Sequence, residues 1–402
     1  MTVGERRSSN NALIAYHFFP HYRTGIVREL CSSESPHYIF LGDAADPIHE
    51  VQELDITAPV IASRYVRTRS YASWRWFWQP GLLPKALLSG ADTWILLSLP
   101  TNLSVWTTAA AGRVLGKNVV FWGHGWIKEY NSSRRTLRRL FFRLAKSILL
   151  YGHNAKELAI RDGFPADRLH VVYNSLDHAT QLKLRAKPGE GIDFRARAAY
   201  FNRPELPTLV CTSRLTAQRD LTMAIHAMAV LKRQGLEANL LLIGDGPQRE
   251  QLAALSRECG VDVHFVGACY DETKIARLMQ CSELTLAPGK VGLTAIHSLT
   301  YGVPVVTHSD PSEQMPEFEA VIDGWNGVLF QRGEVNDLAR AIREGLSLSH
   351  SLEQSRRRCY EVIDRFYNPA HQAQIIARAV RGEPVADDGW YEFVSARKRR
   401  GI

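Results

Sequence analysis

The residue best placed for chemistry in the first half of the chain is His124. It stands between Gly123 and Gly125, directly after the apolar run 119–122, which predicts a buried strand. Ligands of open α/β sheets bind at the carboxyl ends of the strands, and the two glycines leave room around the imidazole. The alternative is a histidine whose hydrogen bonds serve the structure alone.

The stretch 287–306 in the second half is suited to receive a phosphate. Gly289 and Gly292 let the backbone pass close to a ligand. A helix is predicted to begin near Leu293, so its free N–H groups and the positive end of its dipole point back at this loop. Phosphates bind to helix starts of this kind. The alternative is an ordinary loop, helix and strand of an α/β domain.

A third candidate is the loop 20–25, which follows the first predicted strand, Ala12 to Phe19. Its Gly25 lies where doubly wound folds bind ligands, ahead of a helical stretch at 26–31. A plain turn explains a single glycine equally well.

Two segments are candidates for contact with an anionic surface. In 132–150, basic residues interleave with apolar ones at the spacing of an amphipathic helix. Such a helix can lie on an anionic bilayer, or it can pack on the core with a solvated basic face. The aromatic and leucine-rich stretch 71–88 is typical of a membrane interface, or of a helix packed on the sheet. The basic residues of the first segment are Arg134, Arg135, Arg138, Arg139, Arg143 and Lys146.

The composition describes a globular protein of two domains. At 402 residues the chain exceeds the ~250–300 residues over which one core grows. The net charge of +8 favours an anionic partner, but no helix–turn–helix or zinc-finger pattern supports nucleic acid. The six cysteines form no metal pattern, so we expect reduced thiols and a cytoplasmic location. The polar N-terminus is unlike a signal peptide, and no apolar run reaches the ~18–20 residues of a transmembrane helix, so membrane contact would be peripheral.

Strands and helices alternate along the chain, which predicts parallel sheets. We expect an N-terminal Rossmann-like domain at 1–190, a linker at 191–207 and a C-terminal Rossmann-like domain at 208–370. A C-terminal helix and basic tail, 371–402, are expected to return to the N-terminal domain. The predicted strands lie at 12–19, 39–41, 60–62, 92–99, 119–122, 149–152, 169–174, 208–212, 240–243, 263–266, 284–286 and after Pro304. The predicted helices lie at 26–31, 101–115, 132–150, 221–234, 248–259, 273–279, from Leu293, and within 347–386.

Several short motifs occur in an order that is specific when taken together. They resemble those of the GT-B glycosyltransferases of family 4, the group 1 family. In the second half they are Ser213-Arg-Leu-x-x-x-Arg219, Leu-Leu-Ile-Gly244-Asp-Gly-Pro, Phe265-Val-Gly267, Gly292-Leu with Gly302-Val-Pro304, Met315-Pro-Glu317 and Asp323-Gly-Trp-Asn-Gly327. In the first half they are Gly25, His124 and Arg168-x-His-Val-Val-Tyr-Asn174-Ser-Leu-Asp177. The resemblance implies the GT-B fold, an α/β architecture in which two doubly wound parallel-sheet domains face each other across a cleft.

The resemblance also implies a role for each matching residue. Arg214 and Arg219 would grip the donor diphosphate, because fixed cations stabilise the charge that this leaving group gains. His124 would lie on the acceptor side near the reacting centre. The two arginines and the helix dipole can replace a metal ion, so no metal and no other cofactor is expected. The implied donor-binding residues are Gly25, Gly244, Asp245, Gly246, the backbone of Val266, Gly289, the N–H groups of Lys290, Val291, Gly292, Leu293 and Thr294, and His297.

This chain departs from the family pattern at two glutamates. The family uses them to contact the donor sugar and the ribose, and the matching positions hold Gly289 and His297. His297 could still hydrogen-bond a ribose hydroxyl, and Lys290 could supply the lost polar contact. Arg219 replaces a lysine, which keeps the charge but changes the donor geometry. Asp220 replaces a glycine, and its carboxylate could orient Arg219 or cap the next helix.

The resemblance therefore implies a metal-independent enzyme that moves a sugar from a nucleotide diphosphate donor to a hydroxyl, with retention. The acceptor would be a glycan or a lipid-linked glycan, reached through peripheral contact of 71–88 and 132–150 with an anionic membrane at its cytoplasmic face. Two alternatives stay open, namely a sugar-nucleotide 2-epimerase on the same fold and a non-catalytic homologue that binds nucleotide sugars.

Overall fold

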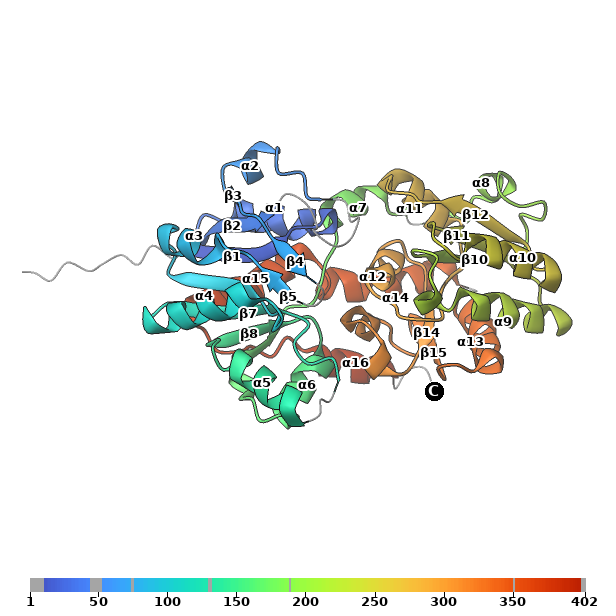
Figure 1. Cartoon of the computed structure of the whole chain (residues 1–402). Helices are drawn as coiled ribbons and strands as arrows, with labels where there is room; N and C mark the ends of the chain where they lie inside the picture. The colour runs from blue at the N-terminus through green and yellow to red at the C-terminus, as the bar shows by residue number, and fades with distance from the viewer. Residues whose placement is uncertain are drawn as a thin grey trace, which may run out of the picture. The chain divides into compact units, whose positions relative to one another are not determined.

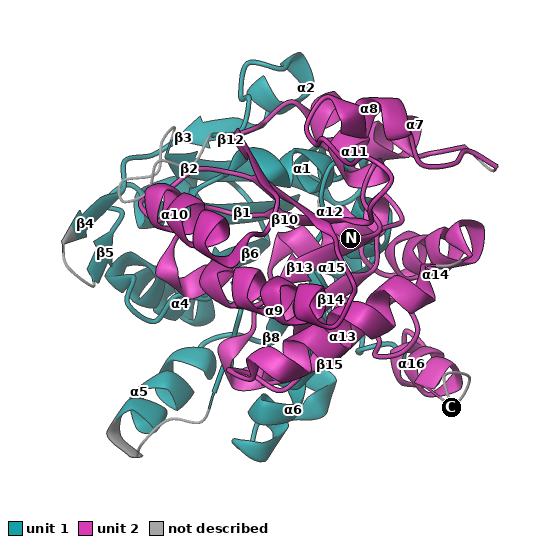
Figure 2. Cartoon of the chain, turned by 90° about the vertical axis from the view of Figure 1, so that its right-hand side faces the viewer, with its two compact units in different colours: residues 1–177, 368–387 teal, residues 178–367, 388–402 magenta. Residues whose placement is uncertain are grey.

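The structure of the protein is a computed structural model that describes residues 11–43, 53–73, 76–128, 132–187, 189–349 and 351–398. The chain divides into two compact units, which Figure 2 shows in different colours. Unit 1 comprises residues 1–177 and 368–387, and unit 2 comprises residues 178–367 and 388–402.

The core of unit 1 is a seven-stranded parallel sheet in the order β3-β2-β1-β6-β7-β8-β9 (Figure 1). Its central strands are continuous apolar runs, as expected for strands that are buried on both faces. The order of the strands reverses between β1 and β6, which is the place where open α/β sheets bind ligands. The strands are β1 (Asn11–Phe18), β2 (His37–Asp43), β3 (Tyr65–Arg67), β6 (Thr93–Leu97), β7 (Asn118–Gly123), β8 (Ser147–Leu150) and β9 (Leu169–Val171).

Helices cover both faces of this sheet. On one face, a cluster around Trp94 and Phe141 includes residues of α3 (Leu82–Leu88), α4 (Leu103–Val114), α5 (Ser132–Phe142) and α6 (His153–Arg161). On the other face, a cluster around Phe40 and Ile376 includes residues of α1 (Thr24–Ser32), α2 (Pro59–Ala62) and α15 (Pro369–Arg381). Asn118 Nδ2 donates to the carbonyl oxygens of Ala379 and Val380 at 3.1 Å each, which ties the end of α15 to β7.

Unit 2 has a six-stranded parallel sheet in the order β12-β11-β10-β13-β14-β15. One face packs against α9 (Leu221–Arg233), α10 (Arg249–Cys259) and α13 (Val335–Leu348), and the other packs against α11 (Glu272–Gln280). Unit 2 also contains α7 (His178–Leu184), α8 (Phe194–Ala198), α12 (Leu293–Thr300), α14 (Leu352–Arg365) and α16 (Trp390–Lys398). The strands are β10 (Thr208–Thr212), β11 (Asn239–Ile243), β12 (Val263–Gly267), β13 (Leu284–Ala287), β14 (Val305–His308) and β15 (Gly327–Phe330).

The boundaries between the units differ from the predicted domain limits. The first boundary lies between Asp177 and His178, and the segment predicted as a linker carries α8 within unit 2. Helix α15 lies in unit 1, whereas α16 packs within unit 2, where the rings of Trp390 and Phe393 each lie 5.0 Å from that of Phe366. The predicted segment 371–402 is thus shared between the two units, because the apolar residues of its two helices pack on different cores.

Two local predictions are wrong. Residues 60–62 form part of α2, and the third strand is β3 instead. Pro59 has no N–H for a sheet ladder but suits the first turn of a helix. The basic helix ends at Phe142 rather than at 150, because the segment 147–150, whose last three residues are buried, pairs with both β7 and β9 as a strand.

The aromatic stretch forms a hairpin rather than a helix. Strands β4 (Tyr71–Ser73) and β5 (Trp76–Trp78) pair antiparallel, and residues 74–75 between them lie outside the described ranges. The side chains of Trp76 and Trp78 stay 46% and 45% exposed. None of the helices within the described ranges is long and apolar enough to cross a bilayer.

Candidate functional site

The predicted phosphate loop of unit 2 lies beside Arg219. A pocket of about 10 Å³ opens between the end of β10, the 3-10 turn η3 (Ala217–Arg219) and the loop from β13 to α12. This volume corresponds to roughly one water molecule. The pocket brings together several residues that the sequence predicted as a donor site. Its lining residues are Thr212, Ser213, Arg219, Leu221, Leu286, Ala287, Pro288, Gly289, Lys290, Val291 and Thr294.

Arg219 is bonded to this loop through both its side chain and its backbone. Its guanidinium donates to the carbonyl oxygen of Lys290, and its own carbonyl oxygen accepts from the N–H of Gly289 at 3.1 Å. Burial lowers the pKa of Arg219, but an arginine keeps its proton at neutral pH. The pocket therefore contains a fixed positive charge.

Gly289 has no space for a side chain. A Cβ atom at this position would lie 2.3 Å from the carbonyl oxygen of Gln218 and 2.8 Å from the carbonyl carbon and Cα of Arg219. These neighbours are backbone atoms, so they can move only if η3 moves with them. The backbone at 218–219 therefore leaves no room for the glutamate of the family pattern at position 289.

Helix α12 begins at Leu293, as predicted, and its first N–H groups have no partner within the helix. The N–H of Val291 is already engaged, since it donates to Gln314 Oε1 at 2.8 Å. The hydroxyl of Thr294 donates to the carbonyl oxygen of Thr212 at 2.8 Å and so ties the helix start to the end of β10. Among the N–H groups from Lys290 to Thr294, that of Val291 is thus taken, whereas those of Lys290, Gly292, Leu293 and Thr294 have no acceptor among the described residues.

Asp220 does not cap the next helix, and Lys290 has a charged partner within unit 2. Lys290 Nζ lies 3.1 Å from Glu313 Oε2, so a carboxylate of unit 2 already pairs with its charge. Asp220 precedes α9 with φ of +49°, and its side chain makes no capping hydrogen bond. A left-handed backbone is the conformation that glycine favours, which accounts for the glycine of the family pattern at position 220.

Gly244 and Gly246 pack against the segment that carries Arg214. A Cβ atom at Gly244 would lie 1.9 Å from the carbonyl oxygen of Ser213, and one at Gly246 would lie 2.5 Å from that of Leu215. The N–H of Leu215 also donates to the carbonyl oxygen of Asp245 at 2.9 Å. The two glycines thus hold Arg214, which is exposed, on a short loop at the carboxyl end of β10.

Val266 lies in a β-bulge at the edge of the sheet. Leu242 pairs with Phe265 and Ile243 pairs with Gly267, so Val266 is the extra residue on β12. A bulge takes its extra residue out of the regular ladder, and bulges are frequent beside functional sites. The backbone of Val266, predicted to read the nucleotide base, is therefore not part of a regular strand pair.

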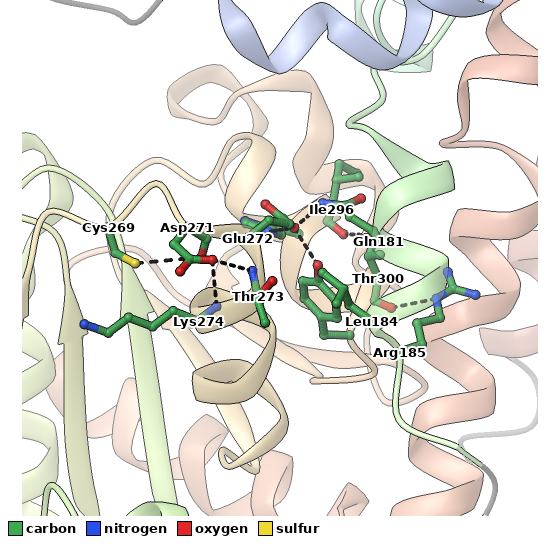
Figure 3. Close-up of polar contacts among 12 residues, drawn as sticks. Gln181, Leu184, Arg185, Cys269, Asp271, Glu272, Thr273, Lys274, Ile296 and Thr300 are labelled. Atoms are coloured by element: carbon green, nitrogen blue, oxygen red, sulfur yellow. Dashed lines mark hydrogen bonds and ion pairs between the residues drawn. The ribbon is translucent and has the colours of Figure 1, made fainter.

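The carboxylate of Glu272 lies beside His297, and Figure 3 shows Glu272 together with its partner Gln181. Its Oε1 accepts a hydrogen bond from Gln181 Nε2 at 2.9 Å and another from the Tyr301 hydroxyl, and it lies 2.8 Å from His297 Nε2. Burial alone would raise the pKa of Glu272, but the hydrogen bonds and charge of His297, helped by Tyr301 and Gln181, lower it to about 2. The carboxylate is thus ionised at neutral pH.

Glu272 was missed in the sequence, where the predicted helix began only at the next residue, Thr273. The available signal was its position five residues after Gly267, at the carboxyl end of an edge strand. Carboxylates near strand ends of Rossmann-like sheets hold ribose hydroxyls in dinucleotide-binding proteins. The partner at position 297 comes from another helix, so only the three-dimensional structure shows the pair.

In unit 1, His124 lies at the end of β7, as predicted. Burial, together with the nearby charge of Arg23, lowers the pKa of His124 to about 4, so the ring is neutral. Its ring lies edge-on to that of Tyr151 at 5.0 Å, and its Nδ1 has no partner among the described residues. A neutral imidazole with an open nitrogen can hydrogen-bond a ligand. The neighbouring Gly125 has φ of +59°, and a Cβ atom there would lie 2.2 Å from Leu150 Cδ2.

The loop after β1 contains a buried cation that the sequence analysis overlooked. Arg23 is only 6% exposed, and its guanidinium lies 4.7 Å from the Tyr16 ring centroid and 4.8 Å from that of Trp122. It also donates to the hydroxyl of Tyr151. Gly25, predicted as a ligand residue, also packs closely against the chain, since a Cβ atom there would lie 2.4 Å from the carbonyl oxygen of Leu176.

Comparison with known proteins identifies the domain in unit 2. Residues 194–362 match the family described as glycosyl transferases group 1. A segment of 101 residues is 34% identical to the GDP-mannose-dependent alpha-(1-6)-phosphatidylinositol dimannoside mannosyltransferase of Mycobacterium tuberculosis and covers 24% of this chain and 26% of that protein. A segment of 150 residues is 31% identical to the glycogen synthase of Edwardsiella ictaluri and covers 35% of this chain and 31% of that protein.

Solved structures establish the fold over almost the whole chain. The structure of HepE from Anabaena in complex with UDP superposes with a TM-score of 0.67 at 16% sequence identity, over 92% of this chain and 99% of that one. The predicted GT-B fold is therefore confirmed. The chain thus has the GT-B fold, and its residues 194–362 match the family of group 1 glycosyl transferases.

Proposed function

We propose that this protein transfers a sugar from a nucleoside diphosphate donor to a hydroxyl of a glycan or lipid-linked acceptor. The observation that carries the proposal is the pocket of unit 2, in which the guanidinium of Arg219 is bonded to the loop that leads into α12. A fixed cation beside an open helix start is suited to an anionic phosphate. Arg214 provides a second cation on the segment that Gly244 and Gly246 hold in place.

The chemistry follows from the charge of the leaving group. When the bond from the sugar to the diphosphate breaks, negative charge builds on the phosphate oxygens. Arg219, Arg214 and the N–H groups of Leu293 and Thr294 stabilise that charge without reorganising, because the fold already holds them in place. The two arginines supply the charge that a metal ion would otherwise bring, and we propose transfer without a metal. Retention of the anomeric configuration is proposed from the family resemblance.

We further propose that Glu272 and His297 together hold the ribose of the donor. Position 297 carries the ribose-contacting glutamate in the family pattern, and in this chain a carboxylate reaches that place from α11. Glu272 uses Oε1 for its protein partners, so Oε2 remains to accept from a hydroxyl. On the acceptor side, the neutral His124 has a buried Nδ1 without a partner among the described residues, which supports a role in hydrogen-bonding the reacting groups.

For location, we propose the cytoplasm, at the inner face of a membrane. Two features of unit 1 support peripheral contact. The hairpin of β4 and β5 exposes Trp76 and Trp78, and α5 exposes Leu137 and Leu140 next to its arginines. Tryptophan and basic residues together are typical of surfaces that contact anionic lipid.

The test is a thermal-shift panel of nucleoside diphosphates and sugar nucleotides, followed by turnover assays with the best ligand. A ligand that binds only the folded state raises the melting temperature. Arg219→Ala should lose most of that shift, whereas Arg233→Ala, an exposed arginine on α9 outside the pocket, should keep it. Isomerised sugar nucleotide without an acceptor would identify an epimerase, and binding without turnover on any acceptor would identify a non-catalytic homologue.

A further inference from the structure

A cavity of unit 1 lies just beyond the loop that carries His124. It is enclosed by α5, α6 and the segment after Gly125, and Figure 1 shows the two helices together. Its volume is about 140 Å³, whereas one water molecule needs only ~10–15 Å³. A group the size of a phosphate therefore fits inside with some of its water. The lining residues are Trp126, Lys128, Arg135, Arg138, Leu158, Arg161 and Asp162.

The charges on this lining are mostly positive. Lys128, Arg135, Arg138 and Arg161 stand against a single carboxylate, that of Asp162. Asp162 holds two lining residues in place. One of its carboxylate oxygens accepts a hydrogen bond from Arg135 Nε, and the other accepts one from Trp126 Nε1 at 3.0 Å.

Two of the basic side chains in the lining have weak or no ion pairs within the described part of the chain, so protein carboxylates compete little with a ligand for them. Lys128 makes no ion pair within the described part of the chain. Arg161 lies 3.7 Å from Glu157 in an exposed pair on α6, and pairs of this kind are weak in water. These two side chains can therefore turn to an anion that enters the cavity.

The cavity is connected to the predicted acceptor side through the backbone. Arg138 donates to the carbonyl oxygen of Gly125, the residue after His124. Trp126 is buried in the cavity wall, where its ring stacks on that of Phe142 with centroids 4.2 Å apart. His124 and Trp126 are two residues apart, and two residues of chain span at most ~7 Å. The backbone of His124 thus lies within ~7 Å of that of a residue in the cavity wall.

We propose that this cavity binds a phosphate or diphosphate group of the acceptor substrate. The proposal rests on the proposed sugar transfer and specifies the acceptor as an anionic one. Arginine and lysine side chains bind phosphate through charge-assisted hydrogen bonds, and the cavity can present several of them to one group. The phosphate could belong to a lipid headgroup or to a soluble phosphorylated glycan, since both present the same oxygens.

The experiment is calorimetric titration of the full chain with inorganic pyrophosphate. Lys128→Ala/Arg161→Ala removes two cations of the cavity. Arg134→Ala/Arg143→Ala removes two exposed arginines from the ends of the same region without touching the lining, and so serves as the matched control. We expect the cavity variant to bind pyrophosphate about tenfold more weakly at this site, because solvent screens each of the two lost charges. The control should bind as the wild type does.

Two further experiments distinguish a lipid phosphate from a soluble one, and the cavity proposal from the donor-site proposal. The first is sedimentation with phosphatidylcholine vesicles, with and without phosphatidylglycerol. If only the cavity variant loses vesicle binding, the phosphate belongs to a lipid headgroup. If the cavity variant and the control sediment alike, the phosphate belongs to a soluble acceptor. Arg214→Ala/Arg219→Ala should lose nucleoside diphosphate binding and keep the cavity site, so the donor proposal is tested independently. Unchanged pyrophosphate binding in the cavity variant, or an equal loss in the control, would overturn the cavity proposal.

Discussion

Replacing Gly289 by the glutamate of the family pattern should damage the protein rather than improve it. The new Cβ would lie 2.3 Å from the carbonyl oxygen of Gln218, and real Cβ contacts stay above 3.0 Å, so the two segments must separate by about 0.7 Å. That movement acts on the hydrogen bond from the N–H of Gly289 to the carbonyl oxygen of Arg219, and on the one from Arg219 to Lys290.

The cost has two parts that can be measured separately. Overpacking a well-packed region costs about 1–3 kcal/mol of folding free energy, which corresponds to a fall of roughly 2–12 °C in melting temperature for a domain of this size. Under the proposed function, displacing the guanidinium of Arg219 removes its charged hydrogen bond to the donor diphosphate, worth about 1.5–3 kcal/mol, so donor affinity should fall about 10- to 100-fold.

The assay is thermal unfolding with and without the best nucleoside diphosphate. Gly292→Ala serves as the control within the same loop, because a Cβ there would meet only ordinary contacts of 3.6 Å and more, from Met315 and Glu317. It should leave the melting temperature of the free protein nearly unchanged. If Gly289→Glu unfolds at the wild-type temperature and binds the donor as tightly or more tightly, the coupling between positions 289 and 219 does not exist.

Further substitutions test single contacts. Glu272→Gln keeps the size of the side chain and removes its charge, so nucleoside diphosphates should bind about 10-fold more weakly; if the variant keeps the wild-type preference for ribose over deoxyribose in calorimetry, Glu272 does not hold the ribose. His124→Ala should lower turnover by about 100-fold or more while donor binding changes little, and near-normal turnover would make His124 structural. Asp220→Gly should raise the unfolding free energy by about 0.5–1 kcal/mol in urea titrations, because it relieves a left-handed backbone; a loss would show that the carboxylate is needed. Burial lowers the pKa of His170 to about 4 in the folded chain, below its unfolded value of ~6.5. Between these two pH values the unfolded state binds more protons than the folded state. The free energy of unfolding therefore falls as the pH drops from 6.5 to 4, by up to about 3 kcal/mol. His170→Gln should flatten this slope, and an unchanged slope would contradict the assignment.

The elements that carry the phosphate pocket were predictable because local signals agree there. Leu284-Thr-Leu286 suits a short strand, Gly289 and Gly292 lie in the loop, and α12 starts at Leu293 where the loop ends. Continuous apolar runs likewise identified most of the buried strands. The prediction failed where a neighbouring element decides the outcome, as at Phe142, where pairing of the next strand with β7 and β9 stops the basic helix.

The contacts within the site were harder to predict than its location. The Cβ clash at Gly289 depends on the backbone at 218–219, some 70 residues earlier in the chain. Glu272 and His297 lie on separate helices, and no periodicity in the sequence relates them. The burial of Arg23 could not be recognised from the sequence, because a charged residue in a loop is usually exposed. In the structure, the rings of Tyr16 and Trp122 lie against its guanidinium.

The placement of α15 in unit 1 has a consequence for how the protein is made. A ribosome completes residues 1–177 first, but one face of their sheet packs against Ile376, Ala379 and Val380. About 190 residues of unit 2 must be synthesised before that cover exists, which takes roughly 10–40 s at ~5–20 residues per second. During that interval an apolar sheet face is open to chaperones and to aggregation, and a fragment ending at residue 177 would keep that exposure permanently.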